Sequence, residues 1–171
     1  MQKGIATLEV ILGTLIIALL LSAAIPNVTS ILDRAALDYE TKKLYSDLKF
    51  LQAMNRSNKF KLTIGTSGGL KDYVFSGEPI SMQLNTKVNS YQILRGTVPL
   101  REAHYMQNIS NFAINVNIEP SQITFNSHGR ATDINDEILS CTLTLTSRLG
   151  KSSSIVFDSV GRIRGGRVAD N

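Results

Sequence analysis

Few residues in this chain have the type and spacing that catalysis requires. His104 and His128 are the only histidines, and Cys141 is the only cysteine. No serine or cysteine lies in a nucleophile motif, and Cys141 alternates with leucines in the manner of a strand residue that faces a core. His128, within NSHGR, is more simply a loop residue than a metal ligand. The sequence therefore predicts no catalytic residue, no cofactor and no enzyme activity.

One acidic run has a weak likeness to a calcium-binding loop. ATDINDEI places Asp133, Asn135 and Glu137 at alternate positions, as the start of such a loop does. The glycine that should follow is absent, and Thr144 stands where the loop needs a glutamate with two ligating oxygens. We therefore expect an acidic turn and no metal site.

Basic side chains gather near the C-terminus in the run GRIRGGR. Arg162 and Arg164 are two residues apart and so share one face of a strand, and Arg167 adds a third guanidinium. The neighbouring glycines, which include Gly161, allow a close approach of the backbone. Guanidinium groups match phosphate oxygens, so the run predicts a DNA contact led by phosphates and indifferent to base sequence. The alternative is a solvated last strand whose arginines keep a sheet edge soluble.

Two further basic residues flank the turn before the run SSIVFD. Arg148 and Lys151 would extend the basic surface if that hairpin folds beside the C-terminal run. Residues 141–171 carry five basic and two acidic residues, which is three of the net charge of +4. No aromatic residue lies among the arginines of the run GRIRGGR, so base stacking is not expected.

A single carboxylate interrupts the first apolar run of the chain. Residues 5–25 contain no charge except Glu9, and as a helix they would span about 32 Å, close to the thickness of a bilayer core. An isolated ionised carboxylate in hydrocarbon costs on the order of several kcal/mol. The run predicts a membrane helix in which Glu9 needs a partner.

A secretory signal peptide is the alternative reading of the same run. Ser22, Ala23 and Ala24 resemble the small residues at which a signal peptidase cuts, and the mature chain would then begin at Ile25. The short leader MQKG, the length of the apolar run and the early Glu9 favour the membrane helix.

A helical pattern continues after Pro26 but becomes amphipathic. Apolar residues recur at helical intervals, and most charged residues lie elsewhere on the helix. The predicted buried stripe consists of Leu37, Leu44, Leu48 and Leu51. Pro26 predicts a kink in one long helix over residues 5–57, of which 5–25 are transmembrane and 26–57 amphipathic.

Residues 58–171 read as a β-rich globular domain. The expected strands lie in FKLTIG, DYVF, ISMQL, YQILR, FAINVNI, QITF, ILSCTLTLT and SSIVFD, and TSGGLKD is expected to be a flexible loop. The residues expected to face inward by alternation are Phe112, Ile114, Val116, Ile118, Cys141, Leu143 and Leu145. We see no internal repeat. The predicted fold class is α+β, with the long helix packed on an antiparallel β-sandwich.

These features together resemble a known family. A basic leader, Gly4, a glutamate five residues later, an apolar helix and Pro26 look like the signal of type IV pilins and of type II secretion pseudopilins. ITFNSHGRATD and SSIVFDSVGRIRGGR are similar to the FimT/GspH branch of minor pilins. In the FimT branch a Gly-Arg-x-Arg tail is associated with DNA binding in natural transformation, and Gly161, Arg162 and Arg164 match it.

The resemblance implies a processing route and a location. A prepilin peptidase would remove residues 1–4 by cutting between Gly4 and Ile5, and the new terminus would be N-methylated. The chain would cross the inner membrane once, with the β-domain outside the cytoplasm, and would enter a pilus or pseudopilus with other pilins. Lys3 fits a cytoplasmic leader.

Cleavage would also give Glu9 a role. The new ammonium at Ile5 would lie at the positive end of the helix dipole, and Glu9 is four residues later on the same face. The resemblance implies pairing with the terminal amine of a neighbouring subunit during assembly. The alternative is a side chain that merely extends to the headgroups.

The function we expect is that of a minor type IV pilin, which acts in pilus assembly or priming and binds DNA for uptake through its C-terminal arginines. A GspH-like pseudopilin of type II secretion is the alternative within the family. A secreted soluble β-domain released by signal peptidase is the alternative of another class.

Overall fold

The computed structural model describes the chain in six segments. These are residues 2–57, 63–67, 70–74, 78–115, 122–133 and 135–169. Side chains are described from Leu8 onward within these segments, apart from those of residues 23–24, 26–27, 63–74 and 166–169. The fold class is α+β with antiparallel sheets, as the sequence predicts.

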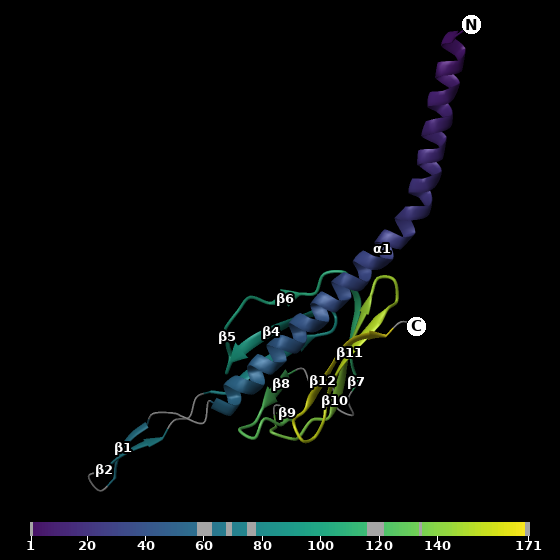
Figure 1. Cartoon of the computed structure of the whole chain (residues 1–171). Coiled ribbons are helices and arrows are strands. Elements are labelled where there is room, and N and C mark those ends of the chain that lie inside the picture. The colour runs from purple at the N-terminus through teal and green to yellow at the C-terminus, as the bar shows by residue number, and fades with distance from the viewer. Residues whose placement is uncertain are drawn as a thin grey trace.

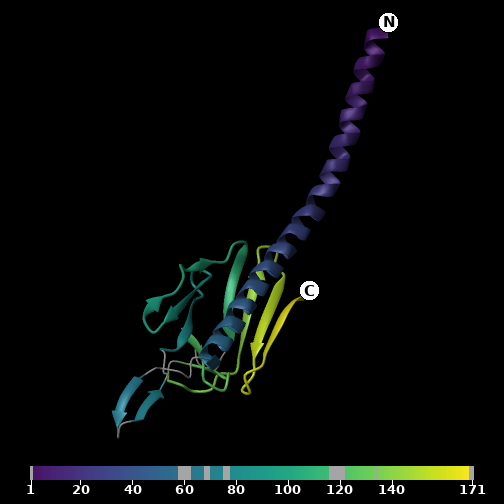
Figure 2. The same cartoon turned by 60° about the vertical axis from the view of Figure 1, so that its left-hand side comes forward.

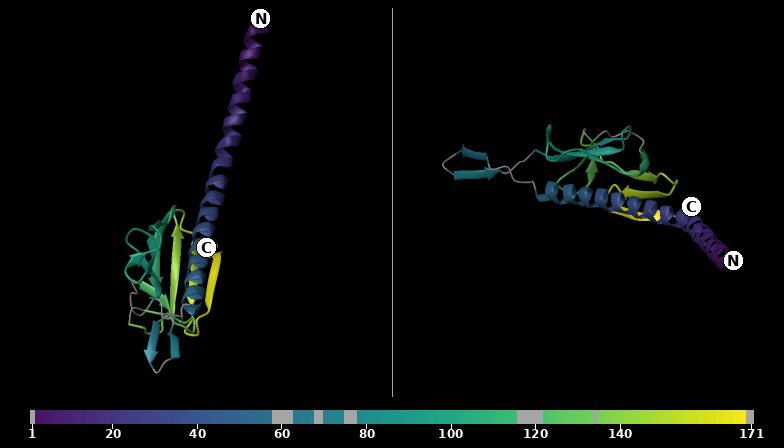
Figure 3. Two further views of the ribbon diagram at one scale, coloured as in Figure 1. Left: turned by 90° about the vertical axis from the view of Figure 1, so that its left-hand side faces the viewer. Right: turned by 90° about the horizontal axis from the view of Figure 1, so that it is seen from above.

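One helix, α1 (Gln2–Ser57), accounts for the first third of the chain. It starts three residues earlier than expected, ends where expected and stays helical through position 26. Its first half projects from the body of the protein, and its axis changes direction before the second half meets the sheets (Figures 1 and 3). Among the described residues, no helix is both long enough and apolar enough to span a membrane.

The strands form two larger sheets and one separate hairpin. The hairpin consists of β1 (Thr63–Ser67) and β2 (Leu70–Val74) and lies apart from the larger sheets (Figure 2). The six-stranded sheet contains β3 (Ile80–Asn85), β4 (Ser90–Arg95), β5 (Val98–Pro99), β6 (His104–Tyr105), β8 (Gln122–Phe125) and β9 (Ala131–Thr132). The four-stranded sheet contains β7 (Ile109–Asn115), β10 (Cys141–Ser147), β11 (Ser152–Phe157) and β12 (Ile163–Ala169) in the order β12-β11-β10-β7.

The first hairpin corrects one expectation. Most of residues 66–72, expected as a flexible loop, belong to β1 and β2, which pair from Thr63 and Val74 to Ser67 and Leu70. The two strands expected on either side of this run therefore extend into it, to Ser67 and from Leu70.

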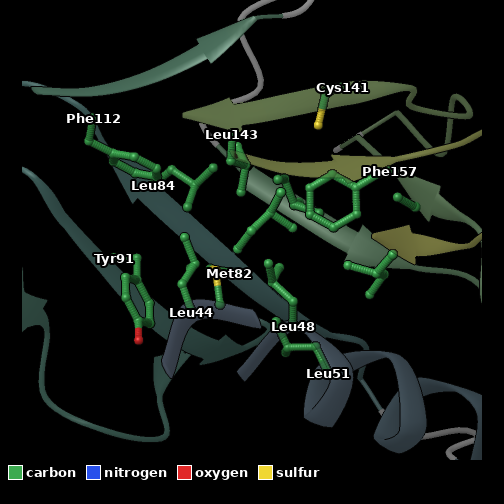
Figure 4. Packing of buried hydrophobic residues seen from close by; sticks show 14 of the residues in the cluster. Leu44, Leu48, Leu51, Met82, Leu84, Tyr91, Phe112, Cys141, Leu143 and Phe157 are labelled. Carbon is green, nitrogen blue, oxygen red and sulfur yellow. The ribbon is translucent and has the colours of Figure 1, made fainter. Parts of the chain in front are cut away.

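The second half of α1 contributes the centre of the core. Leu37, Leu44, Leu48 and Leu51 are all fully buried, so the predicted stripe is confirmed. They pack against Met82 and other side chains of both sheets in one continuous cluster (Figure 4). The helix and the two sheets thus enclose a single core.

The alternating residues of the four-stranded sheet face that core as predicted. Phe112, Cys141, Leu143 and Leu145 are buried, and Ile114 is partly buried beside them. Val116 and Ile118 lie outside the described residues. Burial raises the pKa of the Cys141 thiol to about 12, which keeps it protonated and unreactive at neutral pH.

Two asparagines, Asn55 (buried) and Asn89 (partly buried), join elements whose relative position the apolar core alone would not fix. Asn55 of α1 donates to the carbonyl of Ile80 (2.6 Å) and accepts from its N–H (2.9 Å), so the helix pairs with the start of β3. Asn89 donates to the carbonyl of Ile109 and accepts from the N–H of Phe112, both at 3.0 Å. The first contact fixes the helix to the six-stranded sheet, and the second joins the two sheets.

The fully buried stripe leads to a stability prediction. Replacing Leu48 by alanine should lower the free energy of unfolding by about 2–5 kcal/mol, because a cavity would remain between the helix and both sheets. Urea unfolding of the full chain in detergent micelles, followed by circular dichroism, measures this change. The exposed Val88, replaced by alanine, is the control and should shift the value by less than about 0.5 kcal/mol. Equal shifts for both variants would contradict the packing described above.

Candidate nucleic-acid interface

Two hairpin turns with the same sequence pattern meet at one end of the sheets. FNSHGR (125–130) follows β8, and FDSVGR (157–162) follows β11. The two phenylalanine rings, Phe125 and Phe157, lie 6.2 Å apart in the core. The pattern Phe-Asn/Asp-Ser-x-Gly-Arg is an internal repeat that the sequence analysis missed, although both copies can be read directly in the amino-acid sequence.

Each turn is closed by the side chain of its first polar residue. The Oδ1 atom of Asn126 accepts from the N–H groups of His128 and Arg130, both at 3.0 Å. The Oδ1 atom of Asp158 accepts in the same way from Val160 (3.2 Å) and Arg162 (2.8 Å). Short polar side chains are common in turns because they can satisfy backbone donors locally.

A glycine in the left-handed region completes each turn. Gly129 has φ 78° and Gly161 has φ 86°, values that favour glycine over residues with a Cβ atom. A Cβ atom on Gly161 would also collide with the carbonyl oxygen of Gly129, so the two turns touch. The glycine in each pattern therefore serves both the turn and the contact between turns.

Gln52 of α1 joins these two turns. Its Nε2 atom donates to the carbonyl of Gly129 at 2.7 Å and to the carbonyl of Gly161 at 2.6 Å. The Gln52 side chain is buried, and the turns belong to different sheets. One amide group thus holds the end of the helix against the ends of both sheets.

A groove of about 400 Å³ opens beside this junction. It lies at the end of the domain far from the N-terminus, where α1 stops and the two turns meet (Figure 1). No aspartate or glutamate is among its lining residues, which are Lys49, Gln52, Arg56, His128, Gly129, Val160, Gly161, Arg162, Ile163 and Arg164. Four permanent cations line the groove, so it favours an anion.

Asp158 lies next to the groove and holds two of its arginines. Its Oδ2 atom is 2.7 Å from Nε of Arg162 and 3.8 Å from a terminal nitrogen of Arg164. Desolvation acts to raise the pKa of this carboxyl, but hydrogen bonds and charge from Arg162 and a hydrogen bond from Val160 lower it below its ordinary value. The carboxylate therefore stays ionised at neutral pH, holds the Arg162 guanidinium by a hydrogen bond and attracts that of Arg164 through its charge.

The structure brings together part of the predicted basic surface. Gly161, Arg162 and Arg164 line the groove. Arg167 is opposite Ser154 in the register of β12, farther along the strand, and its side chain is outside the described ones. The two arginines nearest the turn therefore belong to the site.

Arg148 and Lys151 do not join that surface, contrary to the expectation that their hairpin would extend it. Their turn connects β10 to β11, whereas Arg162 follows the opposite end of β11. The strand separates the two turns by about 17 Å at 3.3 Å per residue. Consecutive turns of an antiparallel sheet lie at opposite ends, and the sequence analysis did not apply that rule.

Three helical residues of the groove were missed by sequence reasoning. Lys49, Gln52 and Arg56 come from the last turns of α1, which the sequence analysis treated only as an amphipathic support. Their spacing of three and four residues puts them on one face, next to Leu48 and Leu51. That spacing was a usable signal for a polar face beside the buried stripe.

The two histidines have different surroundings. His128 is in the first turn and lines the groove, so its placement in a loop is confirmed. The Nε2 atom of His104 is 2.7 Å from a carboxylate oxygen of the buried Glu40, and its Nδ1 atom is 2.9 Å from the Lys43 ammonium. A carboxylate only accepts and an ammonium only donates, so this ring carries its hydrogen on Nε2. His104 thus fixes β6 to the helix.

The acidic run 133–137 is a turn, as expected. Oδ1 of Asp133 accepts from the N–H groups of Asn135 and Glu137, both at 2.8 Å. The carboxylate is therefore occupied by the backbone of its own turn. Within the described segments, no group of three or more His, Cys, Asp or Glu side chains could hold a metal ion.

The residues of the N-terminal signal lie on the projecting part of α1. Glu9 is exposed there. Gly4, Ile5 and Pro26 belong to the helical backbone, and their side chains are outside the described ones. Gly4, Ile5 and Glu9 therefore lie at the end of the molecule opposite to the groove (Figure 1).

Comparison with known proteins finds no match to this chain among family models, curated proteins or solved structures.

The role of Gln52 can be tested by removing its amide. Gln52→Leu keeps most of the side-chain volume but leaves the carbonyls of Gly129 and Gly161 without their donor, which should cost about 1–3 kcal/mol of unfolding free energy. Hydrogen exchange should also accelerate over 126–130 and 158–162. Gln83→Leu makes the same change at an exposed position and is the control. Unchanged exchange in both turns of the Gln52 variant would refute the bridging role.

Proposed function

We propose that this chain is a minor type IV pilin, held in the inner membrane by its first helix, which binds the DNA backbone in its basic groove. The observation that carries the proposal is a single helix with two different halves. From Leu37 onward one face of the helix is packed into the core, and the part before residue 30 is apolar and exposed. A projecting apolar helix on a β-rich head is the arrangement that the sequence resemblance implies for a filament subunit.

The polar groups on the projecting half are consistent with an apolar environment. Thr14 donates its hydroxyl to the carbonyl of Ile11 at 2.9 Å, and Ser22 donates to the carbonyl of Leu19 at 2.8 Å. Hydroxyls that bond within their own helix need no water, which is the condition for a helix in lipid. Large apolar side chains from Leu8 to Ile25 are exposed in the isolated chain and would face lipid or neighbouring helices.

In a lipid environment the Glu9 carboxylate would have no water to solvate its charge. Its exposure on the free helix allows contact with an amine from another subunit. An ion pair in hydrocarbon is far more favourable than an isolated carboxylate, so pairing would set the position at which a subunit enters the filament. This is the assembly role that we propose for Glu9.

The groove has the chemistry of a phosphate site. Arg162 and Arg164 come from β12 and the turn before it, and Lys49 and Arg56 come from the end of α1. No phenylalanine, tyrosine or tryptophan lines the groove, so any base stacking there would be limited to the imidazole of His128. Binding should be weak, dependent on salt and indifferent to sequence.

Two alternatives make different predictions for the same molecule. A type II secretion pseudopilin would share the helix and Glu9 but would not need the groove to bind DNA. A secreted β-domain released by signal peptidase would begin at Ile25 and would lack the assembly residues. Binding of DNA in the groove distinguishes the minor pilin from the pseudopilin. The mature N-terminus distinguishes both from a secreted domain.

The DNA proposal predicts a loss that is confined to the groove. Changing Arg162 and Arg164 together to alanine should weaken DNA binding and lower the slope of log affinity against log salt by about 2, because two phosphate contacts disappear. Gel retardation of duplex DNA by the full chain in detergent, at a series of salt concentrations, gives both values. Arg148→Ala is the matched control, since Arg148 is an exposed arginine at the other end of β11. If the double variant retards DNA as the parent does, the groove does not bind DNA.

Replacing Asp158 should change DNA affinity in the opposite direction in the same assay. Asp158→Asn removes the charge that competes for Arg162 and Arg164 but keeps an acceptor for the backbone of the turn. Asn126 already has this role in the equivalent turn, so the fold should be retained. We expect tighter binding at low salt, and weaker binding with an intact turn would argue against a phosphate site.

The assembly proposal predicts a separation of processing from incorporation. In cells that assemble the filament, Glu9→Ala should be inserted and cut after Gly4 as the parent is, yet should be depleted from filaments. Mass spectrometry of the mature N-terminus and quantification of sheared filaments measure the two steps. Leu8→Ala is the neighbouring control and should be incorporated normally. Normal incorporation of the Glu9 variant removes the assembly role, and a mature terminus at Ile25 removes the membrane anchor.

A further inference from the structure

The turn between β10 and β11 repeats the geometry of the groove turns at the opposite end of the sheet. The N–H of Ser147 donates to the carbonyl of Lys151 at 2.8 Å, and the N–H of Gly150 donates to the carbonyl of Ser147 at 3.2 Å. Gly150 has φ 82°, close to the values of the glycines in the groove turns. The run SRLGK (147–151) is thus the same five-residue turn with different side chains at its tip.

This turn is fastened to the helix at the point where the helix leaves the domain. The hydroxyl of Ser147 donates to Oδ2 of Asp33 at 2.5 Å. The Lys151 ammonium donates to the hydroxyl of Ser30 at 2.9 Å and to its carbonyl at 3.3 Å. These two contacts fix the turn beside residues 30–33 of α1, next to the start of the projecting half (Figure 1).

The tip of the turn combines an apolar side chain with basic ones. Leu149 is 57% exposed, and it lies between the exposed Arg148 and the half-buried Lys151. The adjacent helix exposes Ile31 and Leu32 at the same level. Asp33 is the acidic residue that contacts the turn, and its carboxylate is engaged by Ser147. Apolar and cationic side chains together are typical of surfaces that meet anionic lipid.

We propose that this turn rests on the anionic lipid headgroups of the membrane in which α1 is anchored. The inference depends on the membrane anchor of the proposed function. Ser30 is five residues beyond Ile25, where the predicted span ends, which is about 7.5 Å along the helix. The headgroup layer is on the order of 5–8 Å deep on each side of a bilayer. The Lys151 ammonium, bonded to Ser30, therefore reaches its outer edge, whereas Ser147 is bonded to Asp33, about 12 Å beyond Ile25.

Such a contact would fix the orientation of the head before assembly. The helix alone can rotate about its axis, whereas a second contact on one side of it defines which face of the head meets the membrane. Arg148 would be attracted by lipid phosphates, and Leu149 would enter the boundary with the acyl chains. The groove, at the other end of the sheet, would point away from the membrane.

The equivalent turns supply a matched pair of positions for the test. Leu149 and Val160 occupy the same place in their turns, directly before the glycine, and both are 57% exposed. Each is replaced by cysteine in the full chain and labelled with an environment-sensitive nitrobenzoxadiazole dye. Cys141 is buried with a raised pKa, so the unsubstituted chain measures background labelling. The labelled chains are reconstituted into vesicles of phosphatidylcholine alone or with phosphatidylglycerol.

We expect the dye at position 149 to emit at shorter wavelength in vesicles that contain phosphatidylglycerol, and to be quenched by lipids that carry a nitroxide in the headgroup. The dye at position 160 should show neither effect. Arg148→Glu, added to the 149 variant, should reverse the shift in phosphatidylglycerol. Circular dichroism and unfolding of each variant show whether the head remains folded.

Three results would overturn the proposal in distinguishable ways. If the chain does not float with vesicles, the anchor is wrong and the turn contact fails with it. If the chain floats but both labels behave alike, the anchor stands and the turn does not touch lipid. If the shift at position 149 depends on the ratio of protein to lipid but not on lipid charge, the turn contacts another subunit instead.

Discussion

The arrangement of the head depends on one buried amide group. Gln52 donates from the last turns of α1 to the carbonyls of Gly129 and Gly161, which belong to turns of different sheets. Carbonyls that lose water and gain no donor are costly, so this geometry is favoured by about 1–3 kcal/mol over one that leaves both carbonyls unpaired. The leucine stripe supplies the larger share of the burial, but leucines can slide along a sheet. The amide contacts of Gln52 and Asn55 define the register of the helix.

The same local geometry serves two ends of the four-stranded sheet. At one end the turns of Gly129 and Gly161 sit beside arginines and shape an anion groove, and at the other end the turn of Gly150 fastens to the helix through Ser147 and Lys151. The backbone of the turn is constant because a short polar side chain and a glycine are enough to close it. Its tip residues are free to differ, which allows the two ends to take different partners.

How much of this could be predicted from sequence depends on the range of the interaction. The buried stripe from Leu37 to Leu51 was predictable because helical periodicity is a local property of the sequence. The burial of Cys141, Leu143 and Leu145 was predictable because the alternation of a strand is also local. The groove was not, since Lys49 and Arg162 are more than one hundred residues apart in the chain. Strands of two residues, such as β5, carry too few side chains to show a period. Arg148 and Arg162 lie at opposite ends of β11 because of the order in which the strands are connected. Hydrophobic periodicity within one strand carries no information on that order.

The distribution of charge has a consequence that the net value of +4 conceals. Arg162 and Arg164 share Asp158, so each guanidinium is only partly neutralised, whereas Lys49 and Arg56 contribute positive charge from the helix. Their Cα positions are set by the end of α1 and by β12, although the side chains of Arg162 and Arg164 are about two-thirds exposed. A groove of this kind can hold a phosphate weakly. Under the proposed function, a phosphate contact that is weak and indifferent to sequence would let DNA be captured at one point and still slide through the groove.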